Sequence, residues 1–326
     1  MTRAPARARN EPTQPSTGGW VVALALLLNA CATPQTDGMI VSSAVVLQPL
    51  ELTDVPFFPQ AEHQCGPASL AMLLNWAGVA MHPAQLTSQI YLPRRQGGLQ
   101  LEILAAARRQ GRVAYVLRPE LSSLVAEVGS GHPVMVLQNL GLTWHPQWHY
   151  AVVVGFDLPR AQITLRSGTD ARLIMPLRVF EQTWARSDHW AIVVLPPARL
   201  PRTAEELPYL RSVAALEHVQ RHEEASQAYQ AALARWPESL GALIGLGNSW
   251  HRLGDLKGAE FAFRRALQHH PDAPAALNNL AQTLADRGQL TKAEPLAARA
   301  VALEPTSALY RATLRDVRRP SLQGLQ

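Results

Sequence analysis

The stretch Gln60–Leu74, "QAEHQCGPASLAMLL", places a cysteine at the point where a helical pattern begins. From Gly66 onward, apolar residues recur at intervals of three and four, as they do along one face of a helix. Pro67 suits the first turn of such a helix, because the amide hydrogen that proline lacks has no partner there. Backbone N–H groups and the helix dipole at an N-terminus favour a thiolate. The sequence therefore predicts that Cys65 begins a helix and that its thiol pKa is lowered.

The N-terminus has the features of an export signal. Three arginines among the first nine residues precede the apolar run 20–28, "WVVALALLL". A basic stretch followed by a short apolar core is typical of a secretory signal, and this run is too short to span a bilayer as a helix. The "LNAC" that follows resembles the lipobox of bacterial lipoproteins, whose cysteine is lipidated and becomes the new N-terminus.

The lipobox resemblance implies a lipoprotein signal peptide over residues 1–30 and lipidation of Cys31. Because Ala32 is not acidic, it also implies an outer-membrane anchor in the cell envelope, facing the periplasm. An ordinary secretory signal with an incidental cysteine is the alternative. The chain has only two cysteines, so acylation of Cys31 leaves Cys65 unpaired in an exported protein, where thiols tend to be oxidised. This count favours a reactive Cys65, although free cysteine is commonly a small buried apolar residue.

Residues 51–197 are expected to form an α+β domain, preceded by a tether over 31–50. A second helix is predicted over Leu99–Gln110. Beyond it, runs rich in Val and Ile, bounded by Gly, Pro or Asp, predict a set of antiparallel strands. These runs are 133–140, 149–156, 162–168 and 190–197.

A proline-rich linker over 198–205 leads to residues 206–319, where strand signals are absent and positions recur every 34 residues. The recurring sets are Ala225, Ala259 and Ala293; Ala232, Ala266 and Ala300; Pro237, Pro271 and Pro305; Tyr229, Phe263 and Ala297; and Gly254 and Gly288. Small residues let paired helices approach each other, an aromatic ring fills the gap, and the proline ends the second helix. This period resembles that of the tetratricopeptide repeat. We therefore expect an all-α solenoid of three repeats, closed by a capping helix that starts near Ser307.

Acyl transfer by Cys65 requires a base and hydrogen-bond donors aimed at the developing oxyanion. His149 opens an expected strand whose edge can lie beside the Cys65 helix, whereas the histidines of the repeats are expected on exposed faces. The side-chain amide of Gln60, close before the cysteine, and the backbone N–H of Cys65 are candidate oxyanion donors. On the residue pattern alone, His149 is one candidate base among several; His63 lies nearer along the chain, in the connecting loop.

Two stretches together, "FPQAEHQCGPASLAMLLNWAG" (58–78) and "WHYAVVVGFD" (148–157), resemble the bacteriocin-processing, double-glycine-type cysteine peptidases, a papain-like family. The resemblance covers about residues 55–196. It implies a papain-like fold, with Gln60 as an oxyanion donor, Cys65 as the nucleophile, and His149 as the general base and then the general acid.

The family orients its histidine with an aspartate, and in "ITLRSGTDA" Ser167 stands in that place. If a hairpin turn is centred near residues 159 and 160, the residues opposite His149 are about Ser167 to Asp170. Asp157 lies eight residues along the strand, about 26 Å away at ~3.3 Å per residue, and is therefore a poor orienting group. Ser167 is the predicted third member, with Asp170 or a backbone carbonyl as alternatives.

The predicted function is a lipid-anchored cysteine peptidase that cleaves peptide bonds through a thioester, with repeats that recruit a protein partner or the substrate. The alternative is a catalytically degenerate adaptor that binds peptides or proteins, which the neutral Ser167 favours. Transglutaminase-like or amidase chemistry on a related fold also stays open. The identity of the substrate is not indicated, because the transporter features of leader-cleaving relatives, a P-loop and a multi-span membrane region, have no counterpart in this sequence.

Two further classes of partner are not predicted. The net charge of +5 is dispersed, without a long basic run, so nucleic-acid binding is not expected. A metal site of His63, Cys65 and His149 lacks the close pairing of Cys and His that zinc sites have. No metal and no cofactor are therefore expected.

Overall fold

The computed structural model of the chain describes residues 33–42, 48–60, 64–92 and 97–319. The expected signal peptide, Cys31 and His63 lie outside these ranges. None of the described helices is both long and apolar enough to cross a membrane.

Within the described residues, seven strands form one antiparallel sheet in the order β4-β9-β5-β6-β7-β8, with β1 pairing beside β6. A separate hairpin joins β2 and β3. The strands are β1 (Leu50–Glu51), β2 (Tyr91–Leu92), β3 (Gly97–Gly98), β4 (Val113–Val116), β5 (Val134–Asn139), β6 (Trp148–Asp157), β7 (Gln162–Ser167), β8 (Asp170–Pro176) and β9 (Ala191–Leu195).

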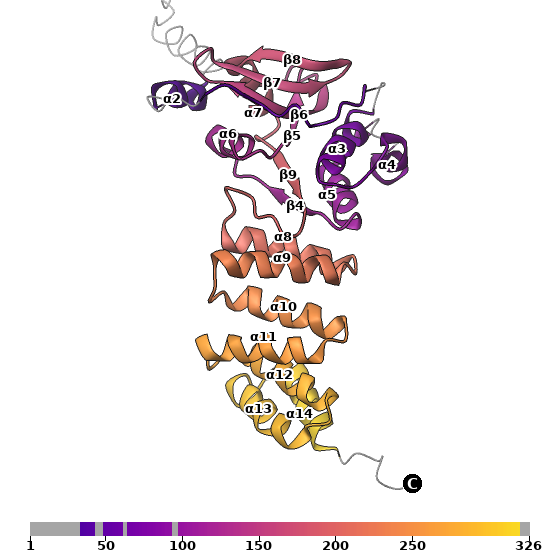
Figure 1. Ribbon diagram of the computed structural model, residues 1–326, viewed down its shortest axis with the longest axis vertical. Coiled ribbons are helices and arrows are strands. Elements are labelled where there is room, and N and C mark those ends of the chain that lie inside the picture. The colour runs from indigo at the N-terminus through magenta and orange to yellow at the C-terminus, as the bar shows by residue number, and fades with distance from the viewer. Residues whose placement is uncertain (1–32, 43–47, 61–63, 93–96, 320–326) are drawn as a thin grey trace, which may run out of the picture.

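Helices cover both faces of the sheet, as Figure 1 shows. The strand β6 is buried on both sides: Tyr150 and Val152 pack with α3, α4 and α5, while Ala151 and Val153 pack with α6 and α7. The helices of this domain are α2 (Pro34–Ser42), α3 (Cys65–Trp76), α4 (Pro83–Ile90), α5 (Gln100–Arg109), α6 (Leu121–Gly129) and α7 (Leu177–Ala185).

Several elements were not anticipated. Part of the expected tether is the helix α2, whose first backbone N–H groups, those of Gln35 and Thr36, donate to the buried carboxylate of Glu181 at 3.1 and 2.7 Å. The tether prediction was therefore wrong for these residues, since a long-range contact fixes them to the domain. The edge strand β8 was missed because its apolar run is only three residues long, Leu173 to Met175, and none of its side chains is fully buried.

Residues 206–319 form a stack of helices that continues from the β4 edge of the sheet (Figure 1). Three antiparallel helix pairs are followed by one last helix, α14, in this part of the chain, which the structure describes without a gap. The helices are α8 (Glu206–His218), α9 (His222–Arg235), α10 (Leu240–Arg252), α11 (Leu256–His269), α12 (Pro274–Asp286), α13 (Leu290–Leu303) and α14 (Ala308–Arg318).

The repeated small residues serve close packing between these helices. A Cβ atom added at Gly245 would lie 2.2 Å from the ring of Tyr229, and one added at Gly247 would lie 2.5 Å from the ring of Phe263. Each aromatic ring therefore occupies the space that a glycine side chain leaves in the neighbouring helix. The recurrent alanines of the period are all fully buried.

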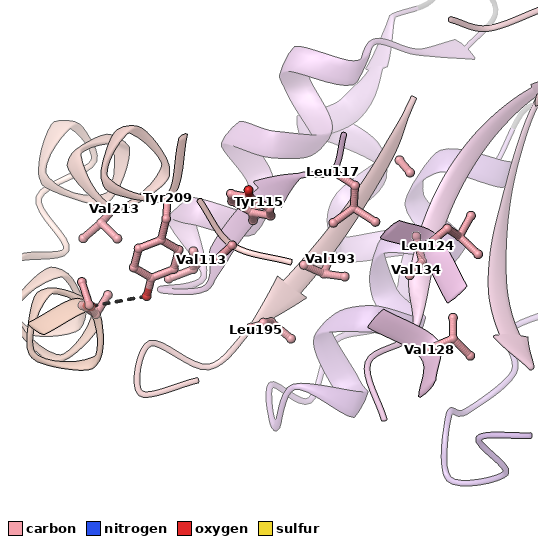
Figure 2. Packing of buried hydrophobic residues seen from close by; sticks show 14 of the residues in the cluster. Val113, Tyr115, Leu117, Leu124, Val128, Val134, Val193, Leu195, Tyr209 and Val213 are labelled. Atoms are coloured by element: carbon pink, nitrogen blue, oxygen red, sulfur yellow. Dashed lines mark hydrogen bonds between the residues drawn. The ribbon is translucent and has the colours of Figure 1, made fainter. Parts of the chain in front are cut away.

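The two domains share one apolar core. Figure 2 shows Tyr115 of β4 and Val193 and Leu195 of β9 packed toward Tyr209 and Val213 of α8. The rings of Tyr115 and Tyr209 are 6.4 Å apart between centroids. The buried apolar side chains thus continue from the sheet into the first repeat.

Polar contacts fasten the segment between the domains. The fully buried carboxylate of Glu127 accepts hydrogen bonds from the backbone N–H groups of Arg202 (3.1 Å) and Thr203 (2.7 Å) and from the Thr203 hydroxyl. It also pairs with Nδ1 of His132 at 2.7 Å. Farther along the interface, the Arg221 guanidinium donates twice to the carbonyl oxygen of Arg109. The predicted linker is therefore an anchored connection between two packed parts.

Candidate active site

Cys65 is the first residue of α3, as the sequence predicts, and it is partly buried. The helix start lies against β6, where the backbone N–H of Tyr150, together with those of Gly66 and Cys65 itself, lowers the pKa of the thiol. Burial acts more strongly in the opposite direction, so the pKa of Cys65 is raised. The prediction of a lowered thiol pKa was wrong. It considered the effect of the helix N-terminus, whereas burial by the surrounding protein, which raises the pKa, cannot be read from the sequence.

His149 and Ser167 face each other across the sheet. Nε2 of His149 lies 2.8 Å from Oγ of Ser167, which is nearly buried. The β6–β7 register pairs Val152 with Arg166, so Ser167 falls beside Ala151, on the same face as His149. The hairpin therefore places Ser167 beside His149. Ser167 is the first of the residues that were predicted to lie opposite this histidine.

Neither of the two aspartates that were considered as the group orienting His149 contacts this histidine in the described residues. Asp170 is exposed and pairs with Ser167 across the β7–β8 turn; within the described residues it makes no hydrogen bond to His149. Asp157 lies at the far end of β6, where it pairs with Arg160 at 2.7 Å. No carboxylate thus orients the imidazole in the described part of the chain.

Gln60 connects three segments at this end of the sheet. Its backbone N–H donates to the carbonyl oxygen of Gly168 at 3.0 Å, and its Oε1 accepts from the N–H of Gly168 at 3.1 Å. Its Nε2 donates to Oγ of Ser69 on α3 at 3.3 Å and to the carbonyl oxygen of Tyr150 at 3.4 Å. Gln60 therefore holds the β7–β8 turn, β6 and the Cys65 helix together.

The four predicted residues converge around the backbone of Tyr150. Its N–H lies at the Cys65 thiol and its carbonyl accepts from Gln60, while the preceding residue is His149, bound to Ser167. No direct hydrogen bond joins Cys65 to His149 among the described residues. Ser167 meets Nε2 of His149, so Nδ1 is the ring nitrogen on the other side of the imidazole from this contact.

Burial acts on both titratable groups of the site. It lowers the pKa of His149 and raises that of Cys65, because a charged form of either loses hydration. Both shifts favour the uncharged forms, the thiol of Cys65 and the unprotonated imidazole of His149.

Sequence reasoning missed three residues of this arrangement: Ser69, Tyr150 and Gly168. Ser69 lies four residues after Cys65, on the same helical face, so helical spacing was a usable signal. Gly168 has a positive φ of 59° in the tight β7–β8 turn, which the "SGTD" sequence indicates. For Tyr150 there was no signal, because its role rests on main-chain groups. The metal interpretation involves His63, which lies outside the described residues; the described ranges contain no cluster of three potential ligands.

Comparison with known families agrees with the two-part architecture. The profile of the Peptidase_C39 like family matches residues 52–191. Two tetratricopeptide-repeat profiles match residues 210–267 and 251–316. A search among curated proteins found no match.

Solved structures with similar folds cover one part of the chain or the other. A putative C39-like peptidase from Bacillus anthracis is 18% identical over 46% of this chain and 98% of its own, with a TM-score of 0.39. The peptidase domain of Streptococcus ComA, a bifunctional ABC transporter involved in quorum sensing, is 22% identical over 44% of this chain and 98% of its own (TM-score 0.35). A tetratricopeptide-repeat protein from Thermus thermophilus is 18% identical over 43% of this chain and 70% of its own (TM-score 0.33).

The chain therefore consists of a C39-like peptidase domain, an antiparallel sheet with helices on both faces, followed by tetratricopeptide repeats.

Proposed function

We propose that this protein is a lipid-anchored cysteine peptidase of the bacterial cell envelope, whose repeats bind a protein partner or the substrate. The observation that carries the proposal is the convergence of Cys65, His149 and Gln60 at one end of one sheet, from segments far apart in the sequence. The lipid anchor rests on the "LNAC" sequence that ends at Cys31.

In the proposed reaction, Nδ1 of His149 takes the proton of the Cys65 thiol when a peptide carbonyl reaches the site. The reaction requires the tautomer in which the Nε2–H of His149 donates to Oγ of Ser167, because that tautomer leaves Nδ1 basic. The sulfur then attacks the carbonyl carbon, and the charge moves to the carbonyl oxygen. Imidazolium next protonates the leaving amine, and water hydrolyses the thioester with His149 again as the base.

The oxyanion would be stabilised by the backbone N–H of Cys65 and the side-chain amide of Gln60. The first backbone N–H groups of a helix have no acceptor within the helix, which leaves that of Cys65 available. The two hydrogen bonds that Nε2 of Gln60 donates are long, 3.3 and 3.4 Å, so an anionic acceptor can replace one of them at small cost.

The repeats offer a polar groove for the partner. A cavity of about 740 Å³ lies along their inner helices, lined among others by Asn248, His251 and Asn279. Asn279 donates to Asn248 at 2.9 Å, and His251 pairs with Asp286 at 2.7 Å. Amide and imidazole groups on the wall of a groove suit the main-chain groups of an extended peptide.

A peptide-binding adaptor without catalysis is the second candidate, and two observations favour it. The partner of His149 is the uncharged Ser167, and burial raises the pKa of the Cys65 thiol. Both make a thiolate harder to form than in a site with a carboxylate.

Labelling with an electrophilic thiol probe such as iodoacetamide separates the two candidates. Wild type, Cys65→Ser and His149→Ala are compared at neutral pH, with His145→Ala as the matched control for a nearby exposed histidine. For a peptidase, we expect labelling to vanish in Cys65→Ser and to slow by about tenfold or more in His149→Ala. Equal, slow labelling of wild type and His149→Ala would refute the catalytic proposal. Palmitate incorporation that is lost in Cys31→Ala and kept in Cys65→Ser tests the anchor separately.

A further inference from the structure

The strand directions place several segments at the same end of the sheet as the candidate site. Because neighbouring strands are antiparallel, β5 ends where β6 begins, at Asn139 and Trp148. The start of β9 at Ala191 and the end of β4 at Val116 lie at that end as well. The loop that joins β5 to β6 therefore stands directly beside His149.

This loop, residues 140–147, is held in one conformation. Oδ1 of Asn139 accepts from the backbone N–H groups of Gly141 (3.0 Å) and Gln147 (2.9 Å). The Arg186 guanidinium donates to the carbonyl oxygens of Asn139 (3.2 Å) and Gly141 (2.8 Å). At Gly141 a Cβ atom would lie 2.4 Å from the carbonyl oxygen of His145, so the turn needs a glycine. The loop is thus a braced element.

The braced loop presents large apolar side chains to solvent. Leu140 is 47% exposed, Leu142 54%, Trp144 at the tip 81%, and Trp148 at the start of β6 54%. Single exposed apolar residues are ordinary, but four within nine positions of one rigid loop mark an interaction surface.

The N-terminal segment reaches the same end of the domain. Nε2 of Gln35 donates to the carbonyl oxygen of Pro119 at 3.1 Å, and its Oε1 accepts from the N–H of Leu121 at 2.5 Å, both just beyond the end of β4. Thr33, the first described residue, is 2% exposed. Cys31 precedes it by two residues, which span at most about 7 Å of chain. An acyl group on Cys31 would therefore leave the protein close to this end of the sheet.

We propose that this end of the domain faces a lipid bilayer, with the braced loop, residues 140–147, and Trp148 at the start of β6 in contact with its interface. The site then acts on peptide segments presented at the membrane surface. The proposal rests on the lipid anchor proposed above. The anchor and the loop supply the two membrane contacts that together give stable, oriented binding. Tryptophan and leucine are suited to the interface, because the indole ring buries its apolar body while its N–H stays hydrated.

A lipid surface fits the loop better than a peptide does. Trp144 projects from the tip of a turn closed by paired hydrogen bonds between Leu142 and His145 (3.2 and 3.1 Å). Such a projecting ring gives a peptide contact on one side only, whereas a bilayer surrounds it. The short chain between Thr33 and Cys31 brings the bilayer to this end of the fold without help from the substrate.

Quenching of tryptophan fluorescence by brominated acyl chains tests the contact. The full lipidated protein is reconstituted into vesicles of phosphatidylethanolamine and phosphatidylglycerol that carry brominated chains. We expect the quenched fraction of the emission to fall by about half or more in the double variant Trp144→Phe/Trp148→Phe, and to be unchanged in Trp250→Phe, a control in the repeats. Quenching that is unaffected by the double variant would overturn the proposal.

A second measurement distinguishes lipid from peptide as the occupant. Trp144→Ala should slow cleavage of a peptide tethered to the vesicle by an acyl chain by about tenfold, and leave cleavage of the same peptide in solution unchanged. An equal loss on both peptides would mean that the loop contacts the substrate, against the proposal. Absence of all cleavage, with quenching as expected, would remove the peptidase function and keep the membrane contact.

Discussion

Two histidines of the sheet domain are each hydrogen-bonded to one side chain, and the two partners differ in charge. His132, at the junction with the repeats, meets the buried carboxylate of Glu127 at 2.7 Å. His149, at the candidate site, meets the hydroxyl of Ser167 at 2.8 Å. The stronger, charged partner thus serves the connection between the domains, and the candidate base has the neutral one.

The difference teaches what each place requires. At the junction, one carboxylate on α6 accepts from donors of two other segments, His132 and Arg202–Thr203, and joins them. At the site, the partner is neutral and burial lowers the pKa of His149, which favours the unprotonated imidazole. Substitutions that exchange these properties test the comparison.

The largest effect is expected at the junction. Glu127→Ala leaves His132 and the N–H groups of Arg202 and Thr203 without their acceptor, and we expect the free energy of unfolding to fall by about 3 kcal/mol. Urea unfolding at neutral pH measures it. Glu120→Ala, which removes the half-exposed carboxylate immediately before α6, is the control and should change little. A similar loss of unfolding free energy in both variants would mean that the hydrogen bonds of Glu127 stabilise the fold no more than an exposed carboxylate does.

The next effect is expected at the site. Ser167→Asp gives His149 the charged partner that His132 has, which raises the pKa of His149 and favours the ion pair with Cys65. We expect thiol labelling at neutral pH to accelerate by about tenfold and its acidic limb to move to higher pH. Ser167→Ala, which removes the orienting group, should slow labelling instead. An unchanged rate in both variants would show that residue 167 does not act on His149.

A smaller effect concerns pH and stability. Burial raises the pKa of Glu127, but the hydrogen bonds from His132, Thr203 and Arg202 together outweigh it, so that the pKa lies below its ordinary value of 4.5. The folded state therefore gains stability from this carboxylate above the ordinary pKa of glutamate, and loses it as the pH falls through the lower folded pKa. Unfolding measured between neutral and acidic pH should become less pH-dependent in Glu127→Gln. An identical pH dependence in wild type and variant would contradict this assignment.

The smallest effect is expected at Asp157, the acidic residue nearest to His149 along the chain. Its carboxylate is partly exposed and pairs with the exposed Arg160 at the far end of β6. Asp157→Asn should leave the rate of thiol labelling unchanged within about twofold, since screened, distant charges act weakly. A clear loss of labelling would contradict this prediction and would mean that the Asp157 carboxylate affects the reactivity of Cys65.

Features that repeat or lie close along the chain were predictable from the sequence. The repeats could be predicted from the period of the sequence, because each helix pair packs mainly on its neighbours. Cys65 at a helix start follows from Gly66 and Pro67, and the position of Ser167 near His149 follows from counting along one hairpin.

Features that depend on distant packing could not be predicted. The raised pKa of Cys65 results from everything that surrounds the thiol, whereas the sequence shows only the helix to which it belongs. Glu181 sits 145 residues from Thr36, so nothing local in the tether indicates that it is docked. Tyr115 and Tyr209 likewise meet across the junction only after both domains have folded.

The shared core at the junction would affect which segment of a bound peptide reaches Cys65. Tyr115 packed on Tyr209 and Thr203 bound to Glu127 join the repeat groove to the domain that carries Cys65. A chain gripped in the groove would present to the thiol only the segment that lies a set length away. The point of cleavage would then depend on the distance of the peptide bond from the segment bound in the groove, as well as on the residues beside that bond.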